Sequence, residues 1–186
     1  DIPKTAVIGT DEYDRFMKDN GLWEKALSAP NDLELERVFL EGRFSLDIML
    51  KLESYLKENS IPLAVRSSSL LEDSQYQPLA GTYATFMLPN NQTTVKERLH
   101  HLLTAIKLIY ASTFKGDAKT LLANTAHRIE EEKMAVIIMD IAGQEYSSGR
   151  YYPTLSGVLK SINYYPVSYM TRDEGVAYLE IGRAHV

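Results

Sequence analysis

The stretch that decides the fold is Leu63–Asp73, which reads LAVRSSSLLED. Its apolar start predicts a buried β-strand over Ile61–Arg66. This strand is expected to deliver the guanidinium group of Arg66 to its end, where the three serines Ser67–Ser69 follow. A cation beside several hydroxyl and backbone N–H groups is the outline of an anion site.

A second part of this candidate site is Leu79–Thr85, which reads LAGTYAT. Gly81 permits a close approach of the backbone to a ligand, because it has no Cβ atom. Arg66 can hold phosphate oxygens through two parallel hydrogen bonds, and the hydroxyls of Ser67 and Ser68 can add further contacts. These residues are therefore candidates for binding a polyphosphate.

A structural role for Arg66 is the alternative. The carboxylates of Glu72 and Asp73 follow it closely in the sequence. An ion pair between Arg66 and either acid would pin a loop and bind no ligand. The residues by themselves leave both interpretations open.

Composition argues against several other classes of function. The 186 residues carry a formal net charge of -5, which disfavours a nucleic-acid-binding surface rich in Lys and Arg. The chain has no Cys, which excludes disulfides and thiolate chemistry and favours a reducing, cytoplasmic location. No apolar run approaches the length of about 20 residues that a membrane span needs. Neither a P-loop motif nor a GxGxxG fingerprint occurs, so nucleotide binding would need another route.

Hydrophobic periodicity predicts an α+β or α/β domain in which helices come mainly first and strands later. The expected helices are a segment from Thr10 to near Gly21, then Leu33–Phe39, Ser45–Lys57 and Thr94–Phe114. The expected strands are Thr5–Gly9, Ile61–Arg66, Tyr83–Leu88, Met134–Asp140, Leu155–Asn163 and Gly175–Leu179. No linker divides the sequence, so a single domain is expected.

Two further groups of polar residues are candidates for function. His100 and His101 are adjacent on the longest predicted helix, so they point in different directions and are expected at the surface. Glu130–Glu132 precedes a predicted strand and is expected to form a solvated face. No metal ligand and no catalytic residue is assigned within this chain.

Four short segments resemble the ATP-binding domain of the dikinase family, which includes phosphoenolpyruvate synthases, pyruvate phosphate dikinases and rifampicin phosphotransferases. Two of them are the Val-Arg-Ser-Ser segment at residues 65–68, with the acidic pair after it, and the Ala-Gly turn that follows. The others are Ile2–Phe16, similar to the family's opening strand and helix, and Leu155–Pro166, similar to its Ser-Gly-Val strand and next turn. The turn departs from the family's Phe-Ala-Gly-Gln, because Leu79 and Thr82 replace the Phe and the Gln.

The resemblance implies that seven residues bind ATP, namely Arg66, Ser67, Ser68, Gly81, Thr85, Met139 and Asp140. Arg66 would contact the phosphates, and Gly81 and Thr85 would belong to the loop over the nucleotide. Met139 and Asp140 would lie at the adenine, where many relatives have Gln followed by Glu or Lys. A Met can pack on a base but cannot read its edge through side-chain hydrogen bonds.

The resemblance also implies an ATP-grasp-type fold, with a mixed sheet and flanking helices, that binds ATP between two subdomains. The full enzyme would use Mg-ATP to phosphorylate a histidine on a mobile domain, which then carries the phosphoryl group to pyruvate on a third domain, forming phosphoenolpyruvate. The family's phosphate-binding Lys would lie upstream of Asp1 and its Mg²⁺ ligands downstream of Leu179. The chain alone is therefore expected to be inactive.

Two alternatives stay open at this point. One is a phosphotransferase of the same family with a different acceptor, because acceptor choice would lie in other domains. The other is a non-catalytic nucleotide-binding module, which the departures at Leu79, Thr82 and Met139 allow. Residues 1–179 are expected to form part of one ATP-binding domain. Residues 180–186 resemble a translated sequencing adapter and are expected to be non-native.

Overall fold

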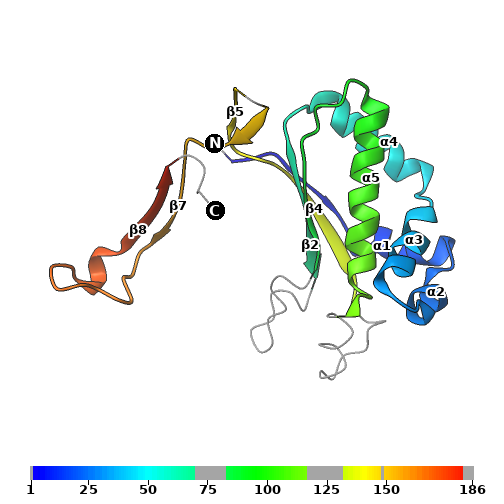
Figure 1. Cartoon of the computed structure of the whole chain (residues 1–186), viewed down its shortest axis with the longest axis horizontal. Helices are drawn as coiled ribbons and strands as arrows, with labels where there is room; N and C mark the ends of the chain where they lie inside the picture. Colours follow the sequence, from blue (N-terminus) through cyan, green and yellow to red (C-terminus); the bar gives the residue numbers. More distant parts are fainter. Residues whose placement is uncertain (1, 70–82, 117–131, 148, 182–186) are drawn as a thin grey trace. The chain divides into compact units, whose positions relative to one another are not determined.

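The computed structural model describes residues 2–69, 83–116, 132–147 and 149–181, and the chain divides into two compact units. Unit 1 spans Asp1–Asp140 and unit 2 spans Ile141–Val186. The described α-helices all belong to unit 1 (Figure 1), whereas the described part of unit 2 consists of strands and one short 3-10 helix.

Unit 1 is built on a four-stranded sheet with the order β1-β4-β2-β3. The strands are β1 (Thr5–Ile8), β2 (Leu63–Ser69), β3 (Thr85–Leu88) and β4 (Met134–Asp140). Every described pairing is antiparallel, so the sheet is not the mixed sheet that was expected. Periodicity along a strand reports which side chains are buried, and it does not report the direction of the neighbouring strand. The expected combination of helices and strands is confirmed.

Strand β2 continues beyond its expected end at Arg66. It covers Leu63–Ser69, and its three serines pair with β4 in register, with Ser69 opposite Met134. The prediction that Arg66 ends the strand is therefore wrong, because the antiparallel partner satisfies the backbone of the polar residues as well. Arg66 lies in the middle of the strand.

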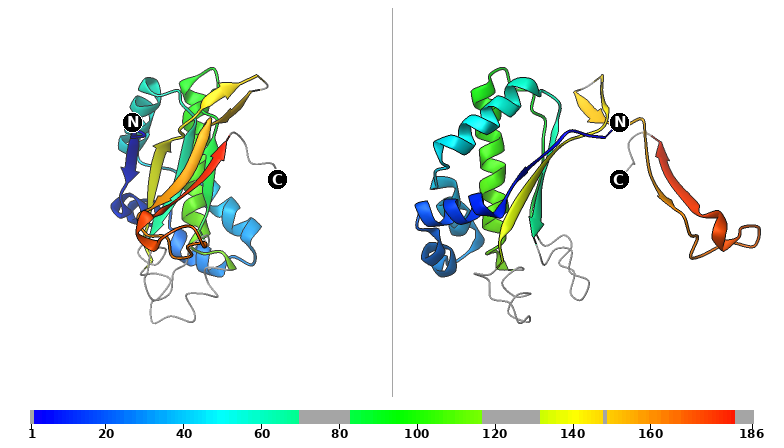
Figure 2. Two further views of the ribbon diagram at one scale, coloured as in Figure 1. Left: turned by 90° about the vertical axis from the view of Figure 1, so that its left-hand side faces the viewer. Right: turned by 180° about the vertical axis from the view of Figure 1, so that it is seen from behind.

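Five described α-helices cover one face of this sheet (Figures 1 and 2). They are α1 (Thr10–Asp19), α2 (Leu22–Ser28), α3 (Asp32–Glu41), α4 (Leu46–Glu58) and α5 (Val95–Ser112). The predictions for all but α2 are confirmed to within a few residues. Helix α2 follows Gly21, whose φ of 58° is in the left-handed region, and its seven residues are too few for a clear helical repeat.

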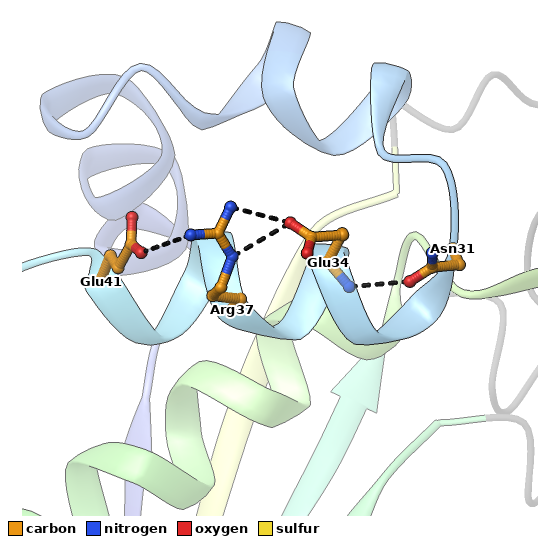
Figure 3. A network of polar contacts seen from close by, with 4 residues as sticks. All are labelled: Asn31, Glu34, Arg37 and Glu41. Carbon is orange, nitrogen blue, oxygen red and sulfur yellow. Dashed lines mark hydrogen bonds and ion pairs between the residues drawn. The ribbon is translucent and has the colours of Figure 1, made fainter.

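Helix α3 shows how local side chains define a helix at the surface (Figure 3). Asn31 caps it, because the Oδ1 atom of Asn31 accepts a hydrogen bond from the backbone N–H of Glu34 at 2.9 Å. Arg37 then pairs with Glu34 at 2.8 Å and with Glu41 at 3.3 Å. Exposed pairs of this kind each stabilise a helix by about 0.2–0.5 kcal/mol.

Aromatic rings fill the core between α1, α3 and α5. The ring centroid of Tyr110 lies 5.0 Å from that of Tyr13 and 5.6 Å from that of Phe16. Phe114 and Phe39 are 5.8 Å apart. Burial raises the pKa of both Tyr13 and Tyr110, so both rings stay neutral and pack as large apolar groups.

Unit 2 contains two antiparallel hairpins. One pairs β5 (Gln144–Tyr146) with β6 (Arg150–Tyr152), and the other pairs β7 (Leu155–Lys160) with β8 (Val176–Ile181). Strands β5 and β6 were not predicted, because three residues are too few to show alternation. The strands expected near Leu155 and Gly175 are confirmed, and most side chains of β7 and β8 are exposed.

Candidate functional site

The described helices leave one face of the unit 1 sheet uncovered (Figure 2). Four of the predicted ATP-binding residues belong to this face. They are Arg66 and Ser68 on β2, Thr85 on β3 and Met139 on β4. Alternation along the strands puts them there, because Val65 and its equivalents on β4 are buried in the core beneath the helices. Residues distant in the sequence are thus brought onto one surface.

Arg66 lies in a row that crosses all four strands. On one side it is opposite Thr85 on β3, and on the other it is opposite Ile137 on β4. Ile137 in turn is opposite Val7 on β1. Arg66 is exposed and, among the described residues, has no ion-pair partner. In the register of the sheet, Arg66 therefore lies between a residue with a hydroxyl group and an aliphatic residue.

An apolar row lies next to the Arg66 row. Met139 is opposite Ala64, and Ala64 is opposite Met87, which is 65% exposed. These residues are two positions from the Arg66 row, which corresponds to about 7 Å along a strand. Ser68 lies two positions from Arg66 in the other direction. The face thus offers an apolar surface, then a cation with a hydroxyl beside it, then a second hydroxyl.

The remaining described candidates, Ser67 and Asp140, lie on the covered face. Ser67 is buried next to the exposed Arg66, and Asp140 is buried next to the half-buried Met139. Neighbouring residues in a strand point to opposite faces, so the structure separates Ser67 from Ser68 and Asp140 from Met139. Neither buried side chain shares a surface with Arg66.

The carboxylate of Asp140 belongs to a buried polar network. Its Oδ1 atom accepts hydrogen bonds from the Nδ2 atom of Asn59 at 2.5 Å and from the hydroxyl of Tyr55 at 3.3 Å. Burial raises the pKa of Tyr55, with the hydrogen bond from Asn59 opposing the shift and the charge of Asp140 adding to it. The Tyr55 hydroxyl is therefore protonated at neutral pH and acts as a donor.

Gly81 lies outside the residues that the structure describes, and so do Glu72 and Asp73. The role of Gly81 in a loop over the nucleotide stays a prediction. The choice between a ligand and a loop acid as the partner of Arg66 stays open in the same way.

A buried acid that the sequence analysis misplaced is Glu132. It was expected on a solvated face, but it is only 3% exposed, and its Oε1 atom accepts a hydrogen bond from the Tyr83 hydroxyl at 3.1 Å. Glu132 lies two residues before Met134, the first buried residue of β4. Extending the alternation of β4 backwards by one step would have found it.

No group of three or more His, Cys, Asp or Glu residues that could hold a metal ion occurs in the described part of the chain. The uncovered positions of β1 to β4 include no Asp or Glu, so this face does not supply the ligands that Mg²⁺ prefers. The exposed positions of His100 and His101 confirm the prediction that they lie at the surface. Among the described helices, none has the length and apolar character needed to cross a membrane.

Comparison with known proteins assigns the chain to a family. The family model of the pyruvate phosphate dikinase AMP/ATP-binding domain matches residues 1–180 of this chain. The chain belongs to this family. The pyruvate phosphate dikinase family membership confirms the resemblance that the Val-Arg-Ser-Ser segment suggested, and it supports AMP or ATP binding by this domain.

The chain is also similar to a much longer protein from Bacillus subtilis (strain 168), the uncharacterized phosphotransferase YvkC. The two are 29% identical over 175 residues, which cover 92% of this chain and 18% of that protein. The chain therefore spans less than a fifth of this relative's length. Together with the family match, the similarity identifies a member of a phosphotransfer family.

Proposed function

We propose that this chain is the nucleotide-binding part of an ATP-dependent phosphotransferase, and that ATP lies on the uncovered face of the unit 1 sheet. The observation that carries the proposal is the convergence of Arg66, Ser68, Thr85 and Met139 on this face from three strands. The family match supports the ligand, because it concerns an AMP/ATP-binding domain.

The chemistry of the two rows suits the two ends of ATP. Arg66 would hold phosphate oxygens bidentately, and the hydroxyls of Ser68 and Thr85 would donate further hydrogen bonds. Met87 and Met139, which flank the buried Ala64, would lie against the base, where a thioether packs well on a flat ring. A base and a polyphosphate would thus extend along one direction of the sheet.

Ser67 and Asp140 take supporting positions in this proposal. Both lie on the covered face, so neither would contact a ligand bound opposite the helices. Gly81 would complete the site from the loop before β3. Within this proposal residues 1–179, with both compact units, belong to one ATP-grasp-type domain.

The reaction proposed for the longer polypeptide is that of a phosphoenolpyruvate synthase or dikinase. The β-phosphate of ATP would be carried by a histidine on a mobile domain and then accepted by pyruvate on a third domain. AMP would be released, and the γ-phosphate would go to water in a synthase or to inorganic phosphate in a dikinase. Mg²⁺ would neutralise the charge on the phosphates when bound, with ligands from outside the described residues. The chain alone would bind ATP without turnover, in the cytoplasm.

A phosphotransferase with another acceptor is the second candidate. It is favoured by the similarity to YvkC, whose name specifies phosphotransfer and no acceptor. Incubation of the longer polypeptide with pyruvate, inorganic phosphate and ATP that carries the radiolabel in its β-phosphate separates the two. Labelled phosphoenolpyruvate supports the dikinase reaction, whereas labelled polypeptide without this product supports a different acceptor.

The binding site itself is tested with Arg66→Ala. Loss of charge-assisted hydrogen bonds worth about 1.5–3 kcal/mol should weaken ATP binding by about 10- to 150-fold, measured by calorimetric titration of the purified chain. Arg43→Ala is the matched control, because Arg43 is also exposed but lies between α3 and α4 in the helical layer. Equal ATP affinity of both variants and the original chain would contradict the proposed site.

A further inference from the structure

A buried hydrogen-bond network lies at the C-terminal end of strand β4, on the covered face of the sheet. Its centre is Asn59, which caps α4 and is 6% exposed. The Nδ2 atom of Asn59 donates to the Asp140 carboxylate at 2.5 Å and to the Tyr55 hydroxyl at 3.1 Å. Its Oδ1 atom accepts from the backbone N–H of Ile61 at 3.0 Å. Both ends of the side-chain amide are thus engaged.

The backbone of Asn59 is held from a second direction. Its carbonyl oxygen accepts hydrogen bonds from Asn90 Nδ2 at 3.1 Å and from Arg98 Nη1 at 2.8 Å. Asn90 also donates to the carbonyl of Ile61 at 2.9 Å, and its φ of 52° is unusual for a residue other than glycine. A buried network in which every polar group is hydrogen-bonded holds only in one local arrangement, because the bonds need defined distances and angles. Apolar side chains of the same volume do not impose this requirement.

The network acts on the part of β4 that carries the proposed base contact. Asp140 is the last residue of β4 and follows Met139, whose side chain points to the other face. The backbone N–H of Asp140 also donates to the Lys4 carbonyl at 3.0 Å. Among the described residues, no cation pairs with the Asp140 carboxylate. Of its two hydrogen bonds, the one from Asn59 is shorter than the one from Tyr55.

We propose that Asn59 is a positioning residue of the nucleotide site, which holds the Asp140 end of β4 so that Met139 lies flat against the base. This inference rests on the proposed function. Without the amide, a buried carboxylate has lost its closest donor, and the strand end must move to hydrate it. The movement displaces Met139 and leaves Arg66 in place, because Arg66 lies three residues along β2 from Leu63, the partner of Asp140.

Because the network is proposed to hold Met139 and not Arg66, its loss should affect the binding of two ligands differently. Tripolyphosphate has the phosphates of ATP and no base, so it reports on Arg66 and not on Met139. Asn59→Asp places a second carboxylate against Asp140 and should weaken ATP binding by about tenfold, with tripolyphosphate binding unchanged within about twofold. Arg66→Ala should weaken the binding of both ligands.

The double variant Asn59→Asp with Asp140→Asn is the rescue, because it exchanges the donor and the acceptor and restores the hydrogen bond. Its ATP affinity, measured by calorimetry with the purified chain, should return to within about threefold of the original. Circular dichroism melting of each variant accompanies the titrations, and a variant that does not fold is replaced by Asn59→Ser, which shortens the side chain and adds no charge.

Three outcomes have distinct meanings. ATP-selective weakening with rescue supports the positioning role. Equal weakening for ATP and tripolyphosphate, or no rescue by the exchanged pair, would overturn it and leave the proposed function standing. If the original chain binds neither ligand, the proposed function itself fails.

Discussion

The two faces of the unit 1 sheet use alternate residues of the same strands for different tasks. Ile138 is fully buried in the core beneath the helices, whereas its neighbour Ile137 lies beside Arg66 on the uncovered face. Ser67 and Ser68 divide in the same way on β2. Stability is therefore expected to depend on the covered face and nucleotide binding on the uncovered one, although the two sets of residues are interleaved in the sequence.

Truncating Ile137 and Ile138 separately tests whether stability depends on the covered face and not on the uncovered one. Ile138→Ala removes a fully buried side chain and should lower the free energy of unfolding by about 2–5 kcal/mol. Ile137→Ala should cost about 1 kcal/mol or less. Urea unfolding followed by the fluorescence of Trp23, the single Trp, reports on unit 1 alone. Similar costs for the two variants would show that both faces are packed in solution.

A second test concerns Glu132, the buried acid two residues before the start of β4. Tyr83→Phe removes the hydroxyl that donates to Glu132 and should cost about 1–3 kcal/mol, because the buried carboxylate loses a donor. Tyr178→Phe, on an exposed position of β8, is the control and should leave the Trp23 transition unchanged. A neutral Tyr83→Phe would mean that Glu132 is hydrated, as the sequence analysis expected.

The helical layer can be weakened without touching either face of the sheet. Thr94→Ala removes the capping box of α5 and should destabilise unit 1 by about 0.5–2 kcal/mol. Thr93→Ala, at the exposed neighbouring position, should have an effect within about 0.5 kcal/mol. ATP affinity should be the same in both variants. A selective loss of affinity in Thr94→Ala would show that helix stability and the uncovered face are coupled.

The smallest expected effect depends on pH. Burial raises the pKa of Glu12 on α1, with Arg15 and Ser45 opposing the shift. The folded chain then keeps this proton to higher pH than the unfolded chain. Stability therefore falls as the pH rises from the ordinary pKa of a glutamate through the folded pKa, and the full loss is present above the folded pKa. Glu12→Gln should therefore melt slightly higher than the original chain at pH 7.

The gain from Glu12→Gln should shrink as the pH falls towards the ordinary pKa of a glutamate, because the carboxyl of the original chain is then protonated in both states. Glu24→Gln, on an exposed position of α2, is the control. Melting curves of the three proteins between pH 4 and pH 8 provide the comparison. A gain that grows at low pH would reverse the assigned direction.

Much of unit 1 could be predicted from the sequence, because its long elements repeat their apolar residues clearly. Helix α5 and strand β4 appear within two residues of their expected bounds. The family also follows from four short segments that occur in the expected order along the chain, the one around Arg66 among them. Alternation would further have placed Ser67 and Ser68 on opposite faces, had β2 been extended through the serines.

Other features depend on contacts that sequence patterns do not contain. The antiparallel directions of the described strands are a property of their pairing, which the periodicity within a single strand does not report. Strands β5 and β6 have three residues each, which is too short for a pattern. The bond from Asn59 to Asp140 joins residues far apart in the sequence, and nothing in either local segment indicates the other. The site was therefore predicted as a set of residues, and its division between two faces was not.

The most direct test of the account is a methyl NMR titration of the chain with ATP. Ile137 and Ile138 are adjacent and chemically identical, and they differ in the face that they occupy. Ile and Met methyl labelling lets the signals of both isoleucines and of Met139 be followed up to millimolar ATP. If the nucleotide binds on the uncovered face, the Ile137 and Met139 signals shift in a saturable way while that of Ile138 stays nearly unchanged. Saturable shifts confined to Ile138, or no shift at either position, would contradict nucleotide binding on the uncovered face.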